Sequence, residues 1–147
     1  SQTEEKSIIF NLTDTINNLL KKYKSNKYEF FSNESLKFNG RENLIRRCIL
    51  NILENGLTYG NKIFVEIKKS LNNIVITVED DGPGIPKNEY ANVFKPFYRI
   101  DKSRGLNKSG VGLGLSVAQD IVKSHGGSIS LSESKHKGLN VKISLPF

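Results

Sequence analysis

The segment from residue 41 to residue 59 places the strongest constraint on how this chain folds. Its apolar residues recur three and four positions apart, as on one face of an α-helix, and Gly60 marks the end of the pattern. These apolar residues are Leu44, Ile45, Cys48, Ile49, Ile52 and Leu53. A helix with one apolar face must pack against an apolar surface. The rest of the chain is therefore expected to supply that surface.

Other segments with regular hydrophobic patterns are expected to supply the apolar surface against which the long helix packs. The predicted strands are residues 8–10, 28–31, 36–38, 63–67, 74–78, 129–131 and 141–145. The other predicted helices are residues 12–23, capped by Asn11 or Thr13, residues 113–122, and a short helical piece near residues 87–93. Polar turns predict hairpins at residues 32–34 and at Asn72 with Asn73. The order of elements predicts an α+β fold, a two-layer sandwich with three helices on one face of a mixed, mostly antiparallel sheet.

The size of the chain predicts one domain, residues 1–147, with a single core. No run of about 18 apolar residues and no charged-then-apolar leader is present, so neither a membrane span nor a signal peptide is expected. The sequence contains no methionine, which indicates a fragment or a processed chain. Cys48 is expected to be a buried structural thiol, and the spacing of Cys48, His125 and His136 does not suit a zinc site.

The formal net charge of +7 is compatible with nucleic acid, a polyanionic ligand or an acidic protein partner. Basic residues are spread from Lys6 to Lys142 and are not grouped with aromatic residues. A nucleic-acid-binding face is therefore not expected.

Polar residues interrupt the apolar face of the long helix. Asn51, Asn55 and Tyr59 are four positions apart and lie along one stripe. Amides on the core side of a helix are costly unless they find partners. Either they satisfy nearby backbone groups or they face a ligand.

An acidic, glycine-rich turn follows the predicted strand at residues 74–78. It reads Asp80-Asp81-Gly82-Pro83-Gly84-Ile85. Its glycines allow the backbone to approach a flat ligand closely, and the first carboxylate would accept a hydrogen bond from an exocyclic amine such as that of adenine. Taken alone, the segment is also compatible with a simple turn.

A second glycine-rich segment, Gly110 to Leu115, precedes the helix at residues 113–122. Alternating glycines expose N–H groups at a positive helix terminus, which suits phosphate oxygens. The spacing is neither a dinucleotide fingerprint nor a P-loop. Lys102, Arg104 and Lys108 lie just before it and would accompany a triphosphate, although a solvated loop explains them equally well. Phe94 and Phe97 lie on either side of Pro96, beside this loop. They would either anchor a hinge of the loop or pack in the core.

Together these segments resemble the ATP-binding catalytic domain of bacterial sensor histidine kinases, in the superfamily of gyrase B, Hsp90 and MutL. Asn51 to Tyr59 looks like the N box, Asp80 to Gly84 the G1 box, Phe94 to Phe97 the F box and Gly110 to Leu115 the G2 box. Among these kinases the chain is most similar to the osmosensor EnvZ type. The resemblance implies the GHKL (Bergerat) fold, with ATP and Mg²⁺ bound.

The resemblance also assigns roles to residues. Asn55 would ligate Mg²⁺, Asp80 would bind the adenine amine, and residues 99–111 would form the ATP lid. The candidate nucleotide-binding residues are Asn55, Tyr59, Asp80, Gly82, Gly84, Ile85, Phe97, Lys102, Arg104, Gly110, Val111, Gly112, Leu113 and Gly114. Two positions depart from the family: Thr58 replaces a basic residue directed at phosphate, and Gly56 replaces an alanine.

The candidate catalytic residues are Asn51 and Asn55. Hydrolytic relatives carry a glutamate that activates water at the position of Asn51, and an amide cannot act as that base. Glu54 is adjacent to Asn55 in sequence but projects about 100° from it around the helix, so it is a poor substitute for that base. The resemblance therefore implies phosphoryl transfer to a histidine. Neither His125 nor His136 is expected to be that acceptor.

The implied partners are ATP, the phosphoacceptor (dimerisation) domain of the same kinase and a downstream response regulator. The isolated domain is expected to be a monomer of a homodimeric kinase, on the cytoplasmic side of a membrane anchor outside this chain. Three alternatives remain: an ATPase of the gyrase or Hsp90 kind, an anti-sigma serine kinase, and a non-catalytic nucleotide-binding or basic module.

Overall fold

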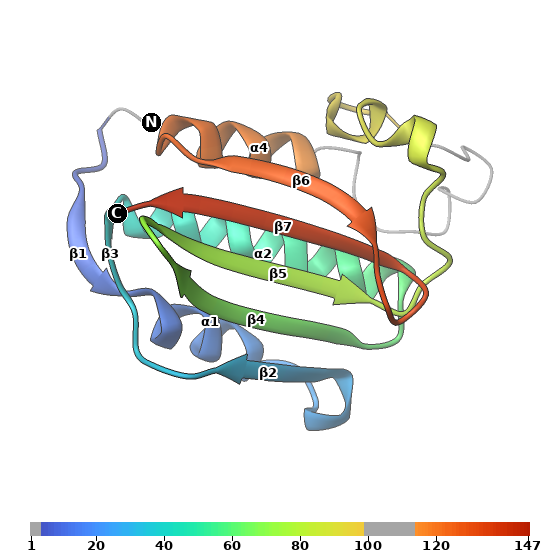
Figure 1. The fold of residues 1–147 in the computed structure, drawn as a ribbon, viewed down its shortest axis with the longest axis horizontal. Helices are drawn as coiled ribbons and strands as arrows, with labels where there is room; N and C mark the ends of the chain where they lie inside the picture. The colour runs from blue at the N-terminus through green and yellow to red at the C-terminus, as the bar shows by residue number, and fades with distance from the viewer. Residues whose placement is uncertain (1–3, 99–113) are drawn as a thin grey trace.

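A computed structural model describes residues 4–98 and 114–147 of the chain. Its larger sheet has the strand order β2-β4-β5-β7-β6 (Figure 1). The strands are β2 (Tyr28–Ser32), β4 (Ile63–Ser70), β5 (Asn73–Asp80), β6 (Ser128–Glu133) and β7 (Leu139–Pro146). β2 runs parallel to β4, and the other neighbours are antiparallel. A second sheet pairs β1 (Ile8–Asn11) with β3 (Lys37–Gly40) antiparallel.

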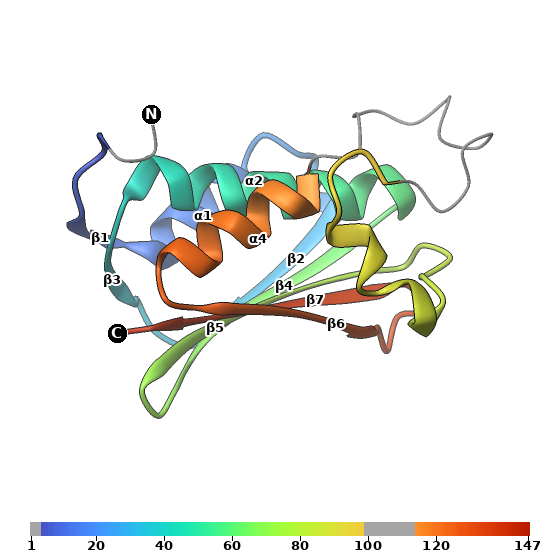
Figure 2. The ribbon, with the colours of Figure 1, turned by 90° about the horizontal axis from the view of Figure 1, so that it is seen from above.

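The described α-helices lie in one layer over one face of the larger sheet (Figure 2). They are α1 (Leu12–Leu20), α2 (Glu42–Tyr59) and α4 (Gly114–Ser124). Three short 3-10 helices complete the described elements: η1 (Ser25–Lys27), η2 (Lys87–Glu89) and η3 (Asn92–Phe94). The predicted two-layer sandwich with a mixed sheet is therefore confirmed. No helix in the described parts of the chain is long and apolar enough to cross a membrane.

A single hydrophobic core fills the space between the helices and the sheet. The alternating residues Ile63, Val65 and Ile67 of β4 are buried. The apolar stripe of α2, represented by Ile49 and Ile52, is buried in the same cluster. Each such side chain contributes about 1.5–3 kcal/mol on transfer from water. The long helix thus finds the surface that its pattern requires.

Cys48 belongs to this core. Its Sγ lies 3.6 Å from the backbone oxygen of Ala118 in α4, to which it donates. Burial raises the pKa of the Cys48 thiol to about 12, so the group stays protonated at neutral pH. The prediction of a buried structural thiol is confirmed.

The hairpin predicted at residues 32–34 is wrong, because β2 and β3 belong to different sheets. Thr13, at the start of α1, explains the separation. Its hydroxyl donates to the backbone oxygen of Glu34 at 3.2 Å and accepts from the N–H of Leu36 at 2.9 Å. These bonds hold residues 34–36 against the start of α1, so that the following strand β3 pairs with β1. The predicted helix cap at Asn11 is confirmed, since its side chain accepts from the N–H of Asp14 at 2.9 Å.

Candidate functional site

The turn after β5 and the start of α4 both contact the C-terminal half of α2. A Cβ on Gly82, in the turn after β5, would lie 2.7 Å from the backbone oxygen of Tyr59, the last residue of α2. A Cβ on Gly114, the first residue of α4, would lie 3.9 Å from the backbone oxygen of Asn51. Figure 1 shows the end of β5 and the start of α4 on the same side of the molecule. The fold therefore brings three of the segments singled out in the sequence together.

Asp80 is the last residue of β5 and its side chain is only 4% exposed. Its Oδ1 accepts hydrogen bonds from the N–H groups of Gly82 at 2.9 Å and Leu139 at 3.3 Å. Desolvation raises the pKa of this carboxyl group, and the two N–H bonds oppose the rise. Among the described residues, no donor bonds to Oδ2. The second oxygen is thus an acceptor held in a fixed position without a protein partner there.

The turn after Asp80 is fastened to α2 and β4. The Oδ1 atom of Asp81 accepts from the N–H groups of Asn61 at 2.7 Å and Lys62 at 3.0 Å. Gly82 has no room for a side chain against Tyr59. Gly84 has a φ of +75°, a conformation that favours glycine. Each glycine of this turn is therefore required by the local geometry.

The polar stripe of α2 borders this turn. Asn51 and Asn55 are half-buried, and Tyr59 is 49% exposed. Within the described part of the chain, neither amide side chain has a hydrogen-bond partner. Of the two readings that the sequence left open, satisfaction of nearby backbone groups is not observed among these residues. The amides are available to a ligand.

Several candidate residues lie outside the described residues: Lys102, Arg104, Lys108, Gly110, Val111, Gly112 and Leu113. Phe97 is described; it is 67% exposed and has a φ of +65°. The core-packing reading does not hold for Phe97. Phe94, in contrast, is half-buried and packs against the core.

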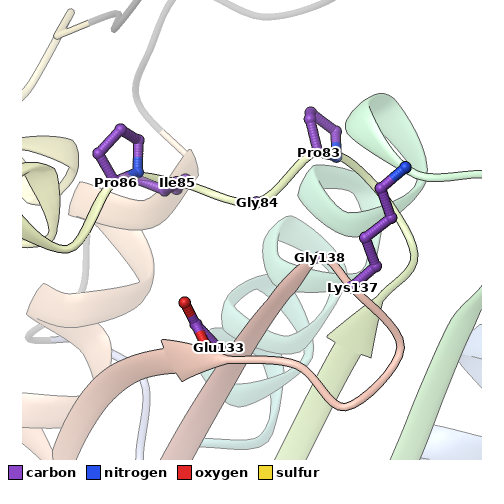
Figure 3. A pocket seen from close by; sticks show the side chains of 7 residues that line it. All are labelled: Pro83, Gly84, Ile85, Pro86, Glu133, Lys137 and Gly138. Carbon is purple, nitrogen blue, oxygen red and sulfur yellow. The ribbon is translucent and has the colours of Figure 1, made fainter.

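A cavity of about 290 Å³ lies between the turn after β5 and the hairpin of β6 and β7 (Figure 3). Its lining residues are Pro83, Gly84, Ile85, Pro86, Glu133, Lys137 and Gly138. Figure 3 shows the side chains of Glu133 and Lys137 directed from the hairpin toward the turn. Of the predicted site residues, Gly84 and Ile85 therefore face this hairpin. The sequence pattern did not predict this hairpin as part of the site.

The hairpin also contacts Asp80, which the sequence pattern did not predict. The N–H of Leu139 holds the Asp80 carboxylate, and a Cβ on Gly138 would lie 1.9 Å from its Oδ1 atom. Gly138 itself, which precedes the predicted strand at residues 141–145, was the one local signal for this contact. That signal did not indicate which element the glycine approaches.

Comparison with known proteins identifies the family. The family described as "Histidine kinase-, DNA gyrase B-, and HSP90-like ATPase" (HATPase_c) matches residues 40–147. The chain belongs to this family. It is an ATP-binding domain of the histidine kinase type, as the sequence resemblance predicted.

Individual relatives place this HATPase_c domain among sensor kinases. It is 37% identical over 107 residues to the sensor histidine kinase GtrS of Pseudomonas aeruginosa, a match covering 73% of this chain and 22% of GtrS. It is 36% identical over 108 residues to the sensor histidine kinase CpxA of Escherichia coli, covering 73% of this chain and 24% of CpxA. The chain thus spans less than a quarter of these relatives.

A solved structure with the same fold is the histidine kinase domain of the E. coli osmosensor EnvZ. The two share a TM-score of 0.73 and 30% sequence identity, over 99% of this chain and 92% of that one. The described parts of the HATPase_c domain therefore have the histidine kinase catalytic fold.

Proposed function

We propose that this HATPase_c domain binds Mg-ATP and donates the γ-phosphate to a histidine on a separate phosphoacceptor (dimerisation) domain of the same sensor kinase. The observation that carries the proposal is the convergence of the α2 amides, the buried Asp80 carboxylate and the N-terminus of α4. Each group suits a different part of ATP.

Asp80 is the residue proposed to recognise the adenine base. A buried carboxylate oxygen accepts from the exocyclic amine of adenine and repels the carbonyl oxygen that guanine presents at the same position. Gly82, Gly84 and Ile85 would form the wall of the base pocket, and Tyr59 would border the nucleotide. The two backbone N–H bonds to Oδ1 leave Oδ2 for this contact.

Asn55 is the proposed Mg²⁺ ligand. The described residues contain no cluster of three or more His, Cys, Asp or Glu side chains that would hold a metal ion alone. Mg²⁺ in nucleotide sites takes few protein ligands and is completed by phosphate oxygens and water, so a single unpaired amide oxygen fits it. When bound, the ion would neutralise charge on the β- and γ-phosphates.

The start of α4 is the proposed phosphate site. Gly114 opens this helix, whose positive N-terminus favours anions. We assign the preceding residues to the same site: Lys102, Arg104, Gly110, Val111, Gly112 and Leu113, with Phe97 at the edge of the lid segment. Thr58 adds no charge, and its hydroxyl donates to the backbone oxygen of Glu54 at 2.7 Å. Basic groups of the lid segment must therefore supply the charge.

Asn51 favours transfer over hydrolysis. An amide cannot take a proton from water, so the domain has no base at this position. The remaining chemistry is alignment: a histidine nitrogen attacks the γ-phosphorus, the bond to the β–γ bridging oxygen breaks, and ADP leaves. Neither His125 nor His136 is proposed as the acceptor. His125 is engaged at both ring nitrogens, and His136 stacks on Phe64 with the ring centroids 3.6 Å apart.

The wider assignments are also proposals. Residues 1–147 would be one catalytic domain, monomeric alone, within a homodimeric two-component kinase that phosphorylates a response regulator. The domain would act on the cytoplasmic side of a membrane anchor that lies elsewhere in the full protein. The sequence relatives named as sensor histidine kinases support these assignments.

The test is phosphotransfer in trans. The chain is mixed with the purified phosphoacceptor domain, Mg²⁺ and ATP labelled in the γ-phosphate, and acid-labile phosphohistidine and released phosphate are both measured. We expect label on histidine and no phosphate release above background. Asn55→Ala should slow transfer on the order of a hundredfold, because transition-state charge is no longer stabilised. Asn43→Ala, at the other end of α2, is the matched control and should leave transfer unchanged.

Other outcomes select the alternatives. Phosphate release without transfer would point to an ATPase of the gyrase or Hsp90 kind. Transfer to a protein serine would point to an anti-sigma kinase. Absence of nucleotide binding would leave a non-catalytic module.

A further inference from the structure

The turn that joins β6 to β7, residues 134–138, is bonded directly to the end of β5. The N–H of Gly138 donates to the backbone oxygen of Asp80 at 3.0 Å. The N–H of the next residue, Leu139, donates to the carboxylate of Asp80 at 3.3 Å. Both the backbone and the side chain of Asp80 are therefore held by this turn.

Gly138 makes that approach possible. A Cβ at this position would lie 1.9 Å from Asp80 Oδ1 and 2.4 Å from the Asp80 backbone oxygen. It would also lie 2.7 Å from the nitrogen of Gly82, the other donor to the carboxylate. No side chain fits here unless the Asp80 carboxylate moves.

Ser134 fixes the shape of the turn. Its buried hydroxyl donates to Glu79 Oε1 at 2.8 Å and accepts from the N–H of His136 at 2.9 Å. Glu79 also accepts from the N–H of Lys135 at 3.1 Å. The ring of His136 stacks on Phe64 of β4, with the planes 11° apart. The turn is thus anchored to the residue before Asp80 and to the neighbouring strand.

We propose that the β6–β7 turn positions the Asp80 carboxylate for adenine, with Ser134 and Gly138 as positioning residues that determine base specificity. The inference rests on the proposed function, because it concerns how Asp80, the residue proposed to recognise adenine, is held in position. It adds that selectivity for ATP depends on a segment more than fifty residues away in sequence. Ser134 and Gly138 touch no nucleotide in this account; they act through Asp80.

A purely structural role for the turn predicts a different result. Loosening the sheet edge would weaken binding of every nucleotide alike. Loss of positioning weakens only the contact with the exocyclic amine. ATP and inosine triphosphate separate the two cases, since they share the ribose and triphosphate and differ in a base amine against a carbonyl.

The experiment measures dissociation constants for ATP and inosine triphosphate with Mg²⁺ present. The chains compared are wild type, Ser134→Ala and Ser132→Ala. Ser132 is the matched control: its exposed hydroxyl, two residues earlier on β6, accepts from Asn140 Nδ2 at 3.3 Å. We expect Ser134→Ala to weaken ATP binding about fivefold, the size of one net hydrogen bond, and not to weaken the binding of inosine triphosphate. Ser132→Ala should alter neither.

A double-mutant cycle with Asp80→Asn supplies the second readout. If Ser134 acts through Asp80, Ser134→Ala has no further effect on ATP affinity once Asp80 is replaced. Gly138→Ala should abolish ATP selectivity more completely. If that variant does not fold, as judged by its thermal unfolding, the Ser134 cycle decides alone.

The outcomes distinguish this inference from the proposed function. A wild-type chain without ATP selectivity overturns both. If the wild type prefers ATP, the proposed function stands and only the inference is at stake. The inference is overturned if Ser134→Ala retains full selectivity, weakens the binding of both nucleotides equally, or adds its full effect to that of Asp80→Asn.

Discussion

At the residue scale, the burial of Asp80 works against the stability of the fold. An ionised carboxylate that is 4% exposed loses most of its hydration, and desolvation is the largest cause of its raised pKa. The hydrogen bonds from Gly82 and Leu139 offset part of that loss. A residue that destabilises the apo domain is typical of a binding site.

This cost predicts how stability depends on pH. Between the ordinary Asp pKa of 3.8 and the raised folded-state pKa, the folded chain retains a proton that the unfolded chain has lost. The contribution of Asp80 to the free energy of unfolding therefore falls as pH rises through that window, and the deficit persists at neutral pH. Asp80→Asn removes this dependence. We expect the stability of the variant relative to wild type to increase from acidic to neutral pH.

Urea unfolding at a series of pH values checks this prediction. A difference between the two chains that stays constant with pH would show that burial of Asp80 has no effect on its protonation.

The sequence pattern singled out the candidate site residues that belong to local motifs, and it did not single out those that depend on distant contacts. Asp80 and Gly84 were recognised because a strand end, a carboxylate and a turn glycine follow one another in the chain. Ser134 and Gly138 were missed because their roles arise from the pairing of β7 with β5. Nothing in the turn itself indicates which strand it will reach.

At the element scale, His125 joins the C-terminus of α4 to the N-terminus of α2. Its Nε2 accepts from the N–H of Arg41 at 3.1 Å, and its Nδ1 lies 2.8 Å from the backbone oxygen of Ile121. This pattern requires the neutral ring with its proton on Nδ1. Arg41 also bonds through Nη2 to the hydroxyl of Ser124 at 2.8 Å. α2 carries the proposed Mg²⁺ ligand and α4 begins at the proposed phosphate site. These bonds join the two helices at the ends that lie away from the site.

His125→Phe should therefore destabilise the domain. Phenylalanine keeps a ring near Phe38 but leaves the Arg41 N–H without this acceptor, at a cost of about 1–3 kcal/mol. His136→Phe is the matched control, because His136 stacks on an aromatic ring and phenylalanine preserves the stack. Thermal unfolding should show a lower midpoint for the first variant and little change for the second. Equal unfolding midpoints for His125→Phe and wild type would show that the hydrogen bonds of His125 between α4 and α2 do not stabilise the domain.

Gly56 gives a test of packing against helix propensity. Alanine in place of a helix-interior glycine normally stabilises by about 1 kcal/mol. Here, a Cβ on Gly56 would lie 2.7 Å from Cγ2 of the buried Ile63 in β4, and overpacking of that kind costs about 1–3 kcal/mol. We expect Gly56→Ala to be destabilising by about 1 kcal/mol in urea unfolding. An increase in stability would mean that Ile63 adjusts freely.

The elements themselves followed the hydrophobic pattern closely, whereas one strand pairing did not. Residues 28–31 and 36–38 alternate and are separated by turn-forming residues, which is the pattern of a hairpin. Tertiary bonds from Thr13 decide otherwise, and β2 instead joins β4 in parallel. Local pattern predicts that a strand forms, while long-range contacts select its partner.

At the scale of the whole molecule, the site lies at one end of the sandwich while the core lies between its layers. Asp80 lies at the end of β5 and the amides lie on the C-terminal half of α2, whereas the apolar faces of both elements pack in the core. Substitutions at the site are therefore expected to change binding more than folding. The proposed reaction also needs an acceptor histidine, which neither His125 nor His136 is proposed to supply.

In the proposed function, the buried Asp80 selects adenine for a Mg-dependent phosphoryl transfer. Calorimetry of ATP and GTP binding, with and without Mg²⁺, tests it most directly in wild type and Asp80→Asn. We expect that wild type binds ATP in preference to GTP, that Mg²⁺ strengthens ATP binding, and that Asp80→Asn loses the preference while remaining folded. Equal affinities for ATP and GTP in wild type, or an unchanged preference in Asp80→Asn, would contradict it.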